Sequence, residues 1–186
     1  MIPSGTEISS SLYGAWRLIF VDDEAMAHFN VSIEGFWRSF FAAILALPYF
    51  LVVIIWPAPV AEGVTPWEPD PFMAGLAYIL SWIIFPMVAA VLARLFELTQ
   101  NYIGYITAFN WAGALIAQPL LILEVMTHAG VLSADAAAVL QLPIFVFVVW
   151  YGWVIARISL GATAWIAAAL IFIAKMIDML LFLVLM

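Results

Sequence analysis

The stretch from Asn101 to Gln118, NYIGYITAFNWAGALIAQ, is the part of the chain that decides the fold. It is apolar over a length that can cross a bilayer. Within it Asn110, Ala114 and Gln118 recur at four-residue intervals, which places the two amides on one face of a helix. Because an amide in hydrocarbon is costly without a partner, we expect this face to point toward other helices. The remaining hydrophobic segments should then pack around this span.

The composition of the whole chain indicates an integral membrane protein. Of its 186 residues 68% are hydrophobic and 9% are charged, and the mean hydropathy is +1.17. A soluble domain of this length cannot bury so many apolar side chains, because its own surface must be covered. A net charge of −7 with only five basic residues leaves no phosphate-binding patch, so we expect no nucleic-acid partner. Cysteine is absent, which excludes disulfides and thiol chemistry.

The hydrophobic segments divide the chain into two parts. Residues 1–35 are expected to form a cytoplasmic or interfacial segment, and residues 36–186 a domain of five transmembrane helices, so the predicted fold class is an all-α integral membrane protein. The expected spans cover about residues 36–56, 72–93, 102–123, 136–155 and 161–182. Four spans contain a proline, namely Pro48, Pro86, Pro119 and Pro143. Such kinks either serve movement or belong to ordinary packed membrane helices.

A short amphipathic helix is predicted ahead of the spans. Its apolar stripe consists of Leu12, Trp16, Ile19 and Phe20, and Arg17 lies off that stripe. The helix either lies in the headgroup region with its aromatic side chains just below the surface, or caps the cytoplasmic end of the bundle.

Two further local features lie between this helix and the first span. Glu24 and His28 are one helical turn apart, either as two ligands of a metal ion or as part of an ordinary solvated turn. Ser32 or Asn30 is the expected N-cap of the first span.

The distribution of charge predicts the orientation in the membrane. The arginines of the chain all fall on the N-terminal side of the alternating spans: Arg17, Arg38, Arg94 and Arg157. The two loops on the other side contain carboxylates and no basic residue: Glu62, Glu68 and Asp70 in one, Glu124 and Asp135 in the other. By the positive-inside rule the N-terminus is cytoplasmic and the C-terminus external, that is periplasmic or lumenal.

Lys175 and Asp178 are the opposite-charge pair predicted within a span. They stand three residues apart, so they can form an ion pair on one side of the fifth helix. In one interpretation Lys175 extends to the outer headgroups and the pair anchors the end of the helix. In the other, the pair is buried against the third span and binds a proton or a solute.

The sequence contains no set of residues that suits a catalytic site. Both histidines, His28 and His128, lie in predicted loops, so Ser81 and Ser159 have no intramembrane base. Asp178 is the only acid predicted inside the membrane, whereas an aspartyl protease needs two. HExxH and phosphate-binding glycine loops are absent. We therefore expect no enzymatic activity, no metal site and no cofactor.

The layout of the chain resembles the Yip1-like membrane proteins. The matching fragments are Leu12-Tyr13-Gly14, similar to part of the family's DLYGP motif, and Gly104-Tyr105 in the third span. Ser11 and Ala15 stand where the motif has Asp and Pro. The resemblance implies a cytosolic N-terminal region ahead of five spans, and a protein that organises membranes or takes part in trafficking through partners.

Two functions follow from these observations. The first is a non-enzymatic scaffold or accessory subunit that binds other integral membrane proteins, or further copies of itself, in the lipid bilayer. The second is a small solute or ion transporter or channel, whose polar path would consist of the candidate functional residues Asn110, Gln118, Lys175 and Asp178.

Overall fold

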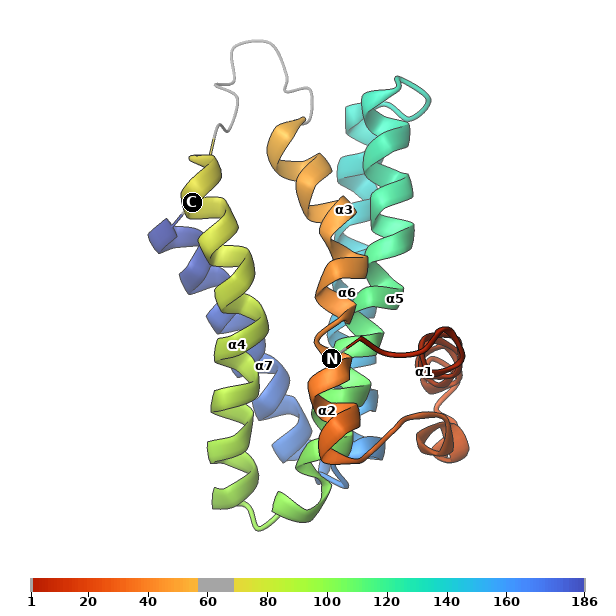
Figure 1. Cartoon of the computed structure of the whole chain (residues 1–186). Helices are drawn as coiled ribbons and strands as arrows, with labels where there is room; N and C mark the ends of the chain where they lie inside the picture. The colour runs from red at the N-terminus through yellow and green to blue at the C-terminus, as the bar shows by residue number, and fades with distance from the viewer. Residues whose placement is uncertain (1, 57–68, 186) are drawn as a thin grey trace.

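The protein is described by a computed structural model that covers residues 2–56 and 69–185 (Figure 1). The described part is entirely helical, and its elements are α1 (Gly5–Leu18), η1 (Asp23–His28), α2 (Ile33–Ser39), α3 (Ala42–Ile55), α4 (Pro71–Leu95), η2 (Thr99–Asn101), α5 (Tyr102–His128), α6 (Ala134–Ser159) and α7 (Ala164–Leu185). Five segments are long and apolar enough to cross a membrane: Ile33–Ile55, Pro71–Leu95, Thr99–His128, Ala134–Ser159 and Ala164–Leu185. This confirms the predicted all-α fold with five helical segments of spanning length. Glu62 and Glu68 of the predicted external loop lie outside the described residues.

Local capping explains where the long helices begin. Asp70 accepts a 2.9 Å hydrogen bond from the backbone N–H of Met73 at the start of α4, where Pro71 occupies the first turn. Ser133 caps α6 in the same way, through the N–H of Ala136. Gly161 has a φ of +68° in the turn before α7, so the last span begins at Ala164 and not at the predicted residue 161.

The five spans form a closed ring of neighbouring helices. Helix α3 packs along α5, α5 along α6, α6 against α7, and α7 along α4, which contacts α3 again (Figure 1). Helix α5 also contacts α1, α2 and α4, and its buried residues include Tyr105, Ala108 and Trp111. The prediction that the other segments pack around the span that contains NYIGYITAFNWAGALIAQ is therefore confirmed for all but α7, which packs mainly against α4 and α6.

The first span is broken, although one continuous helix was predicted from residue 36 to 56. Helix α2 ends at Ser39 and α3 begins at Ala42. The Ser39 hydroxyl donates a 2.7 Å hydrogen bond to the carbonyl of Phe36, three residues earlier. Such bonds back to the helix backbone favour bends. At the other end of α2, Ser32 accepts a 3.0 Å bond from the N–H of Gly35, as predicted for the N-cap.

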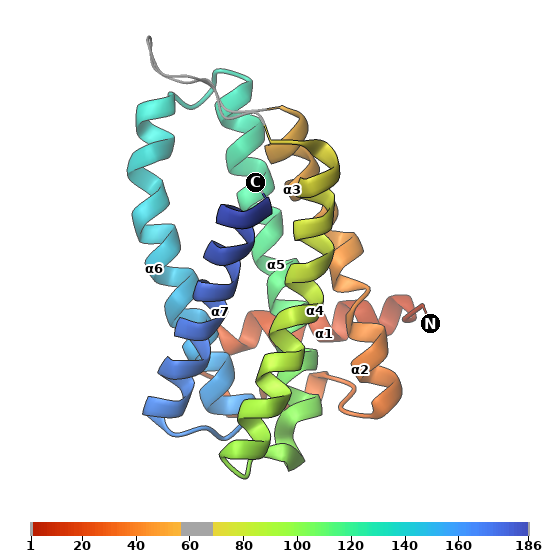
Figure 2. The same cartoon turned by 90° about the vertical axis from the view of Figure 1, so that its left-hand side faces the viewer.

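Helix α1 lies against the side of the bundle and not over its end. It is seen end-on in Figure 1 and lengthwise across the spans in Figure 2. The Tyr151 hydroxyl of α6 donates a 2.6 Å hydrogen bond to the carbonyl of Ala15 and so attaches α1 to the spans. The structure therefore excludes the interpretation of α1 as a cap on the bundle.

The buried face of α1 differs from the predicted apolar stripe. Its buried residues are the small ones and a leucine: Ser11, Gly14, Ala15 and Leu18. Trp16 and Phe20 are exposed, whereas Leu12 and Ile19 are only partly buried. Small side chains allow α1 to approach α5 closely, and the bulky aromatic residues consequently point away from the protein.

Candidate functional site

A cavity of about 340 Å³ lies inside the ring of spans, and all five spans contribute to its wall. Its lining is mostly apolar and aromatic: Ala46, Tyr49 and Phe50 of α3; Tyr78, Ser81, Trp82, Phe85 and Pro86 of α4; Phe109, Asn110, Ala112, Gly113, Ile116, Ala117 and Leu120 of α5; Val148, Tyr151, Gly152 and Ile155 of α6; and Ala174, Lys175 and Asp178 of α7. We call this space the inner cavity.

Aromatic side chains connect the helices around the inner cavity. The rings of Phe50 and Tyr78 stack with their centroids 4.4 Å apart, and the Tyr78 hydroxyl donates a 2.5 Å bond to the carbonyl of Ala43 in α3. The ring centroids of Phe85 in α4 and Phe109 in α5 are likewise 4.4 Å apart. These contacts join α4 to α3 and to α5 by side chains that also form the wall of the cavity.

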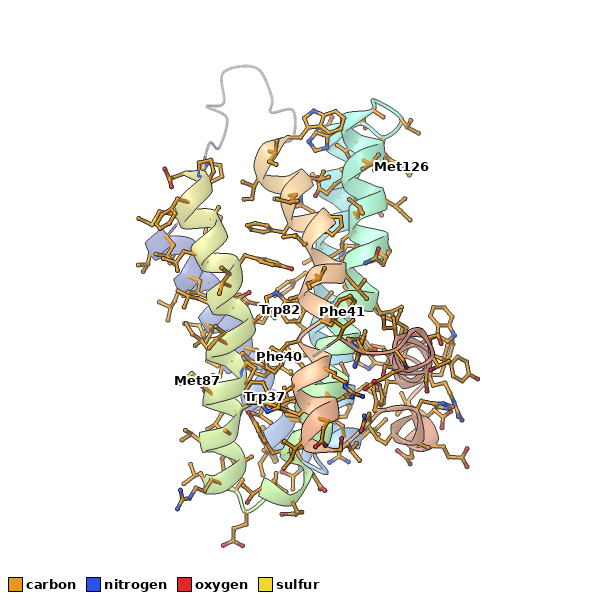
Figure 3. All side chains as sticks on the ribbon, in the orientation of Figure 1. Trp37, Phe40, Phe41, Trp82, Met87 and Met126 are labelled. Carbon is orange, nitrogen blue, oxygen red and sulfur yellow. The ribbon has the colours of Figure 1, made fainter. Side chains whose placement is uncertain are left out.

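Trp82 of α4 is another part of this wall. Figure 3 shows it in the space between α4 and α3. Its ring tip lies 3.6 Å from the position that a Cβ atom on Gly113 of α5 would take. The absence of a side chain at Gly113 therefore leaves room for the cavity beside the tryptophan.

Asn110 is the buried amide at this site. Its side chain is part of the cavity lining, its exposure is 2%, and its Nδ2 donates a 2.9 Å hydrogen bond to the Oγ of Ser39. The prediction that Asn110 faces other helices is confirmed. Its partner is the last residue of α2, so the amide also holds the position at which the first span breaks.

Gln118 does not line the inner cavity, but it contacts another helix, as predicted. The side chain is exposed, and its Nε2 donates to the carbonyls of Leu45 in α3 at 3.0 Å and of Ala114 at 3.1 Å. Leu45 stands three residues before Pro48, in the turn that a proline disturbs. Gln118 thus donates to carbonyls of α3 and of its own helix on the surface of the bundle.

Lys175 and Asp178 form the predicted ion pair. The Nζ of Lys175 lies 2.6 Å from the Oδ2 of Asp178, and the side chains are 36% and 52% exposed. Both residues line the inner cavity. Lys175 and Asp178 are the twelfth and fifteenth residues of the 22-residue α7, so the pair begins at the middle of the helix and lies in its C-terminal half.

A second space, the outer cavity, adjoins Lys175 from the other side. Its volume is about 630 Å³, and it lies between α3, α5, α6 and α7 near the ends of α5 and α6 that the 129–133 turn connects. Its polar lining consists of Tyr49, Glu124, Thr127, Asp135, Gln141 and Lys175. Lys175, Tyr49, Leu120 and Val148 line both cavities, so the ammonium group stands where the two spaces meet.

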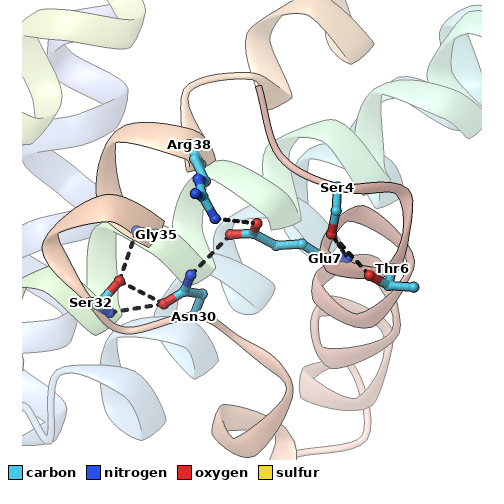
Figure 4. Close-up of polar contacts among 7 residues, drawn as sticks. All are labelled: Ser4, Thr6, Glu7, Asn30, Ser32, Gly35 and Arg38. Atoms are coloured by element: carbon cyan, nitrogen blue, oxygen red, sulfur yellow. Dashed lines mark hydrogen bonds and ion pairs between the residues drawn. The ribbon is translucent and has the colours of Figure 1, made fainter. Parts of the chain in front are cut away.

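Polar residues of the N-terminal segment and of α2 form two networks that fix the N-terminal segment. In the first, Glu7 of α1 accepts a 3.0 Å bond from Arg38 and a 3.1 Å bond from the amide of Asn30 (Figure 4). Asn30 in turn accepts bonds from the N–H and the hydroxyl of Ser32. This network connects α1 to the start of the first span.

The second network is centred on Arg17. Its guanidinium binds Asp22 and Glu24, and its Nη1 lies 3.0 Å from the Nε2 of His28. Desolvation lowers the pKa of Arg17, but the hydrogen bond and the charge of Asp22 outweigh it and the net pKa is raised. Glu24 and His28, predicted as either metal ligands or part of a solvated turn, are thus brought together around an arginine.

Three features of the site were missed at the sequence level. These are the outer cavity, the role of Ser39, and the aromatic wall formed by α3, α4 and α5. Glu124 and Asp135 were recognised only as loop carboxylates, and Gln141 carried no distinguishing signal. A polar residue inside an apolar run, such as Ser39, was the one signal that pointed to an interhelical contact.

The comparisons with known proteins do not assign the chain to a family. It matches no family model, no curated protein and no solved structure among those searched.

Proposed function

We propose that this chain is a non-enzymatic, multi-pass membrane protein that binds a small molecule inside the bilayer, as a transporter of a small solute does. The observation that carries the proposal is the inner cavity, because all five spans line it and an ion pair projects into it. Apolar clefts with a few convergent polar groups are the usual form of ligand sites. Ionisable groups in the middle of a span are costly and commonly functional.

The polar path suggested by the sequence is modified accordingly. Asn110, Lys175 and Asp178 belong to the proposed site, and Gln118 does not. The outer cavity supplies a route toward the site from the 129–133 end of the bundle, because Lys175 and three other residues line both spaces.

A glycine pair offers a test of this proposal. Gly113→Phe would place a ring in the inner cavity, whereas Gly75→Phe adds the same ring to α4 at a position where a Cβ atom meets nothing within 4 Å. The protein is purified in lipid nanodiscs, and small molecules that accompany it are extracted and identified by mass spectrometry. We expect a molecule that accompanies the unmodified protein and the Gly75 variant and is lost from the Gly113 variant. Identical extracts from all three proteins would contradict the proposal.

The scaffold or accessory-subunit function remains a second proposal, and the exposed face of α1 supports it. Tyr13, Trp16 and Phe20 point away from the bundle with exposures of 53%, 51% and 66%. Aromatic side chains of this kind are enriched both in protein interfaces and at membrane surfaces. A photo-crosslinking residue in place of Trp16 distinguishes the two environments. A discrete protein adduct, or a dimer of the chain, supports the scaffold, while adducts with lipid alone argue against it. The Yip1-like resemblance belongs with this second proposal.

A further inference from the structure

We propose that the ligand of the inner cavity is an apolar organic cation, which replaces the ammonium group of Lys175 beside Asp178. This inference rests on the proposed function, since it names the chemical class of the molecule that the same site binds. Its evidence is the aromatic character of the wall, the sign of the charge along both cavities, and the position of Lys175 between them.

The wall of the inner cavity suits a large organic cation. Six of its aromatic residues come from three different helices: Tyr49, Phe50, Tyr78, Trp82, Phe85 and Phe109. Faces of aromatic rings attract cations, most strongly when water is excluded. Inorganic cations such as Ca²⁺ or Mg²⁺ instead require several oxygen ligands. Asp178 supplies the only carboxylate among the described residues that line the inner cavity, so a small hard ion would lack ligands there.

The charge along the two cavities also favours a cation. Glu124 and Asp135 line the outer cavity and Asp178 the inner one, whereas Lys175 is the only basic residue among the described residues that line them. Three carboxylates against one ammonium leave a formal charge of −2. An anion would pass Glu124 and Asp135 and then separate Lys175 from Asp178, which would leave that carboxylate without a counter-charge at the middle of a span. A cation is attracted by Glu124 and Asp135 and leaves Asp178 paired, so its only cost is the displacement of the Lys175 ammonium group.

The Lys175 ammonium group can leave Asp178 because the adjacent outer cavity has a polar lining. Its Nζ is 2.6 Å from Asp178, yet the residue also lines the outer cavity, where Glu124, Asp135 and Gln141 offer acceptors. A lysine side chain is flexible and can change its rotamer. The ligand's positive charge then takes over the pairing with Asp178, and the number of paired charges does not fall.

The test compares two probes of nearly the same shape and opposite charge, tetraphenylphosphonium and tetraphenylborate. Binding to the full chain in lipid nanodiscs is measured by equilibrium dialysis, with protein-free nanodiscs as the blank. We expect saturable binding of the phosphonium only. Gly113→Phe should abolish it, and Gly75→Phe should leave it unchanged.

Substitutions of Asp178 and of Lys175 should change the affinity for the phosphonium in opposite directions. Asp178→Asn should weaken phosphonium binding by about tenfold or more, which is about 1.4 kcal/mol. Lys175→Gln should strengthen it, because it removes the competing ammonium. Asp178→Glu, which keeps the charge, should retain the preference for the phosphonium. Thermal unfolding of each variant shows whether it is folded, and the comparison of the two probes on the unmodified chain stands without any variant.

The opposite results overturn the inference in distinguishable ways. Preferential binding of tetraphenylborate that is lost in Lys175→Gln would make the ligand an anion. Phosphonium binding reduced equally by Lys175→Gln and Asp178→Asn would show that the pair has a structural role only. If no saturable phosphonium binding is found, the cation assignment is wrong. The proposed function itself fails only if the accompanying small molecules also prove independent of Gly113.

Discussion

The side-chain amide of Asn110 donates a hydrogen bond of 2.9 Å to the hydroxyl of Ser39, 71 residues away in the chain. Both side chains are buried, with exposures of 2% and 0%. The Ser39 hydroxyl in turn donates a hydrogen bond to the carbonyl of Phe36, so this chain of hydrogen bonds ends on the backbone of α2. The middle of α5 is thereby joined to the point where the first span breaks.

We predict that the hydrogen bond between Asn110 and Ser39 contributes measurably to the free energy of unfolding. Asn110→Ala and Ser39→Ala should each lower the free energy of unfolding, with a coupling energy of about 0.6 to 1.7 kcal/mol between them, the range found for interhelical hydrogen bonds in membranes. A double-mutant cycle of unfolding in mixed micelles measures it. Gln118→Ala is the matched control, because its partners are backbone carbonyls and its side chain is exposed. A coupling energy of zero would show that the bond does not contribute.

The same contact shows how far the sequence determined the fold. The positions of the five spans were predictable because hydrophobic length is a local property of the chain. The break after Ser39 was not, because residues 40 and 41 are phenylalanines and neither glycine nor proline stands there. The break depends on back-bonding by Ser39 and on a partner in another helix, and single-sequence patterns do not contain that partner.

The candidate site, too, was predictable only in part. Asn110, Lys175 and Asp178 are recognisable because polar groups inside apolar runs need partners. The predicted contact of Gln118 with another helix is confirmed, but its partner is a backbone carbonyl of α3 and its side chain is exposed, which the four-residue interval from Asn110 does not reveal. The face of α1 that packs on the bundle was not predicted, because it consists of small residues and a leucine that the apolar stripe does not include.

The contribution of the α7 ion pair to the free energy of unfolding should lie between that of a surface pair and that of a buried pair. Surface pairs contribute roughly 0 to 1 kcal/mol, and breaking a fully buried pair costs about 3 to 5 kcal/mol. Lys175 and Asp178 are partly exposed to the cavities at the middle of the helix. We therefore expect Lys175→Met to destabilise the protein by an amount between these ranges, and Lys175→Met with Asp178→Leu to recover much of the loss. Thermal unfolding in detergent decides it, and small additive effects would instead indicate a solvated pair.

Gly35 should tolerate no side chain. A Cβ atom there would lie 2.0 Å from the backbone oxygen of Asn30, in the turn that Ser32 caps. Gly35→Ala should therefore cost about 1 to 3 kcal/mol, as overpacking does. Gly75→Ala, in a helix with nothing within 4 Å, should be neutral or stabilising by up to about 1 kcal/mol. The melting temperatures of the two variants should move apart, and equal shifts would mean that the turn can relax.

The orientation of the chain is testable because the sequence has no cysteine. The two ends of the bundle are well defined, since Asn101 donates a hydrogen bond to the carbonyl of Leu160 at one end and the ring centroids of Trp56 and His128 lie 4.6 Å apart at the other. Arg94 and Arg157 lie near the first of these ends. With the N-terminus inside, Ala129→Cys should react with an impermeant thiol reagent on intact cells.

Gln100→Cys should react only after permeabilisation, which also shows that this position is accessible. Ser159 is unsuitable as a probe because it is buried and bonded to the carbonyl of Ile155. Gly63, in the other predicted external loop, lies outside the described residues. The reverse labelling pattern would invert the orientation.

The attachment of α1 to Tyr151 also sets a thickness for the surrounding membrane. Between Ala134 and Tyr151, helix α6 rises roughly 26 Å at 1.5 Å per residue, somewhat less than the hydrocarbon core of a typical bilayer of about 30 Å. On the opposite flank α4 runs for 25 residues, or roughly 37 Å, with Arg94 in its last turn. If Trp16 and Phe20 lie among the headgroups, the lipids beside α1 must compress while those beside α4 need not. The protein then creates a one-sided hydrophobic mismatch, which would draw it toward thin or strongly curved regions of membrane.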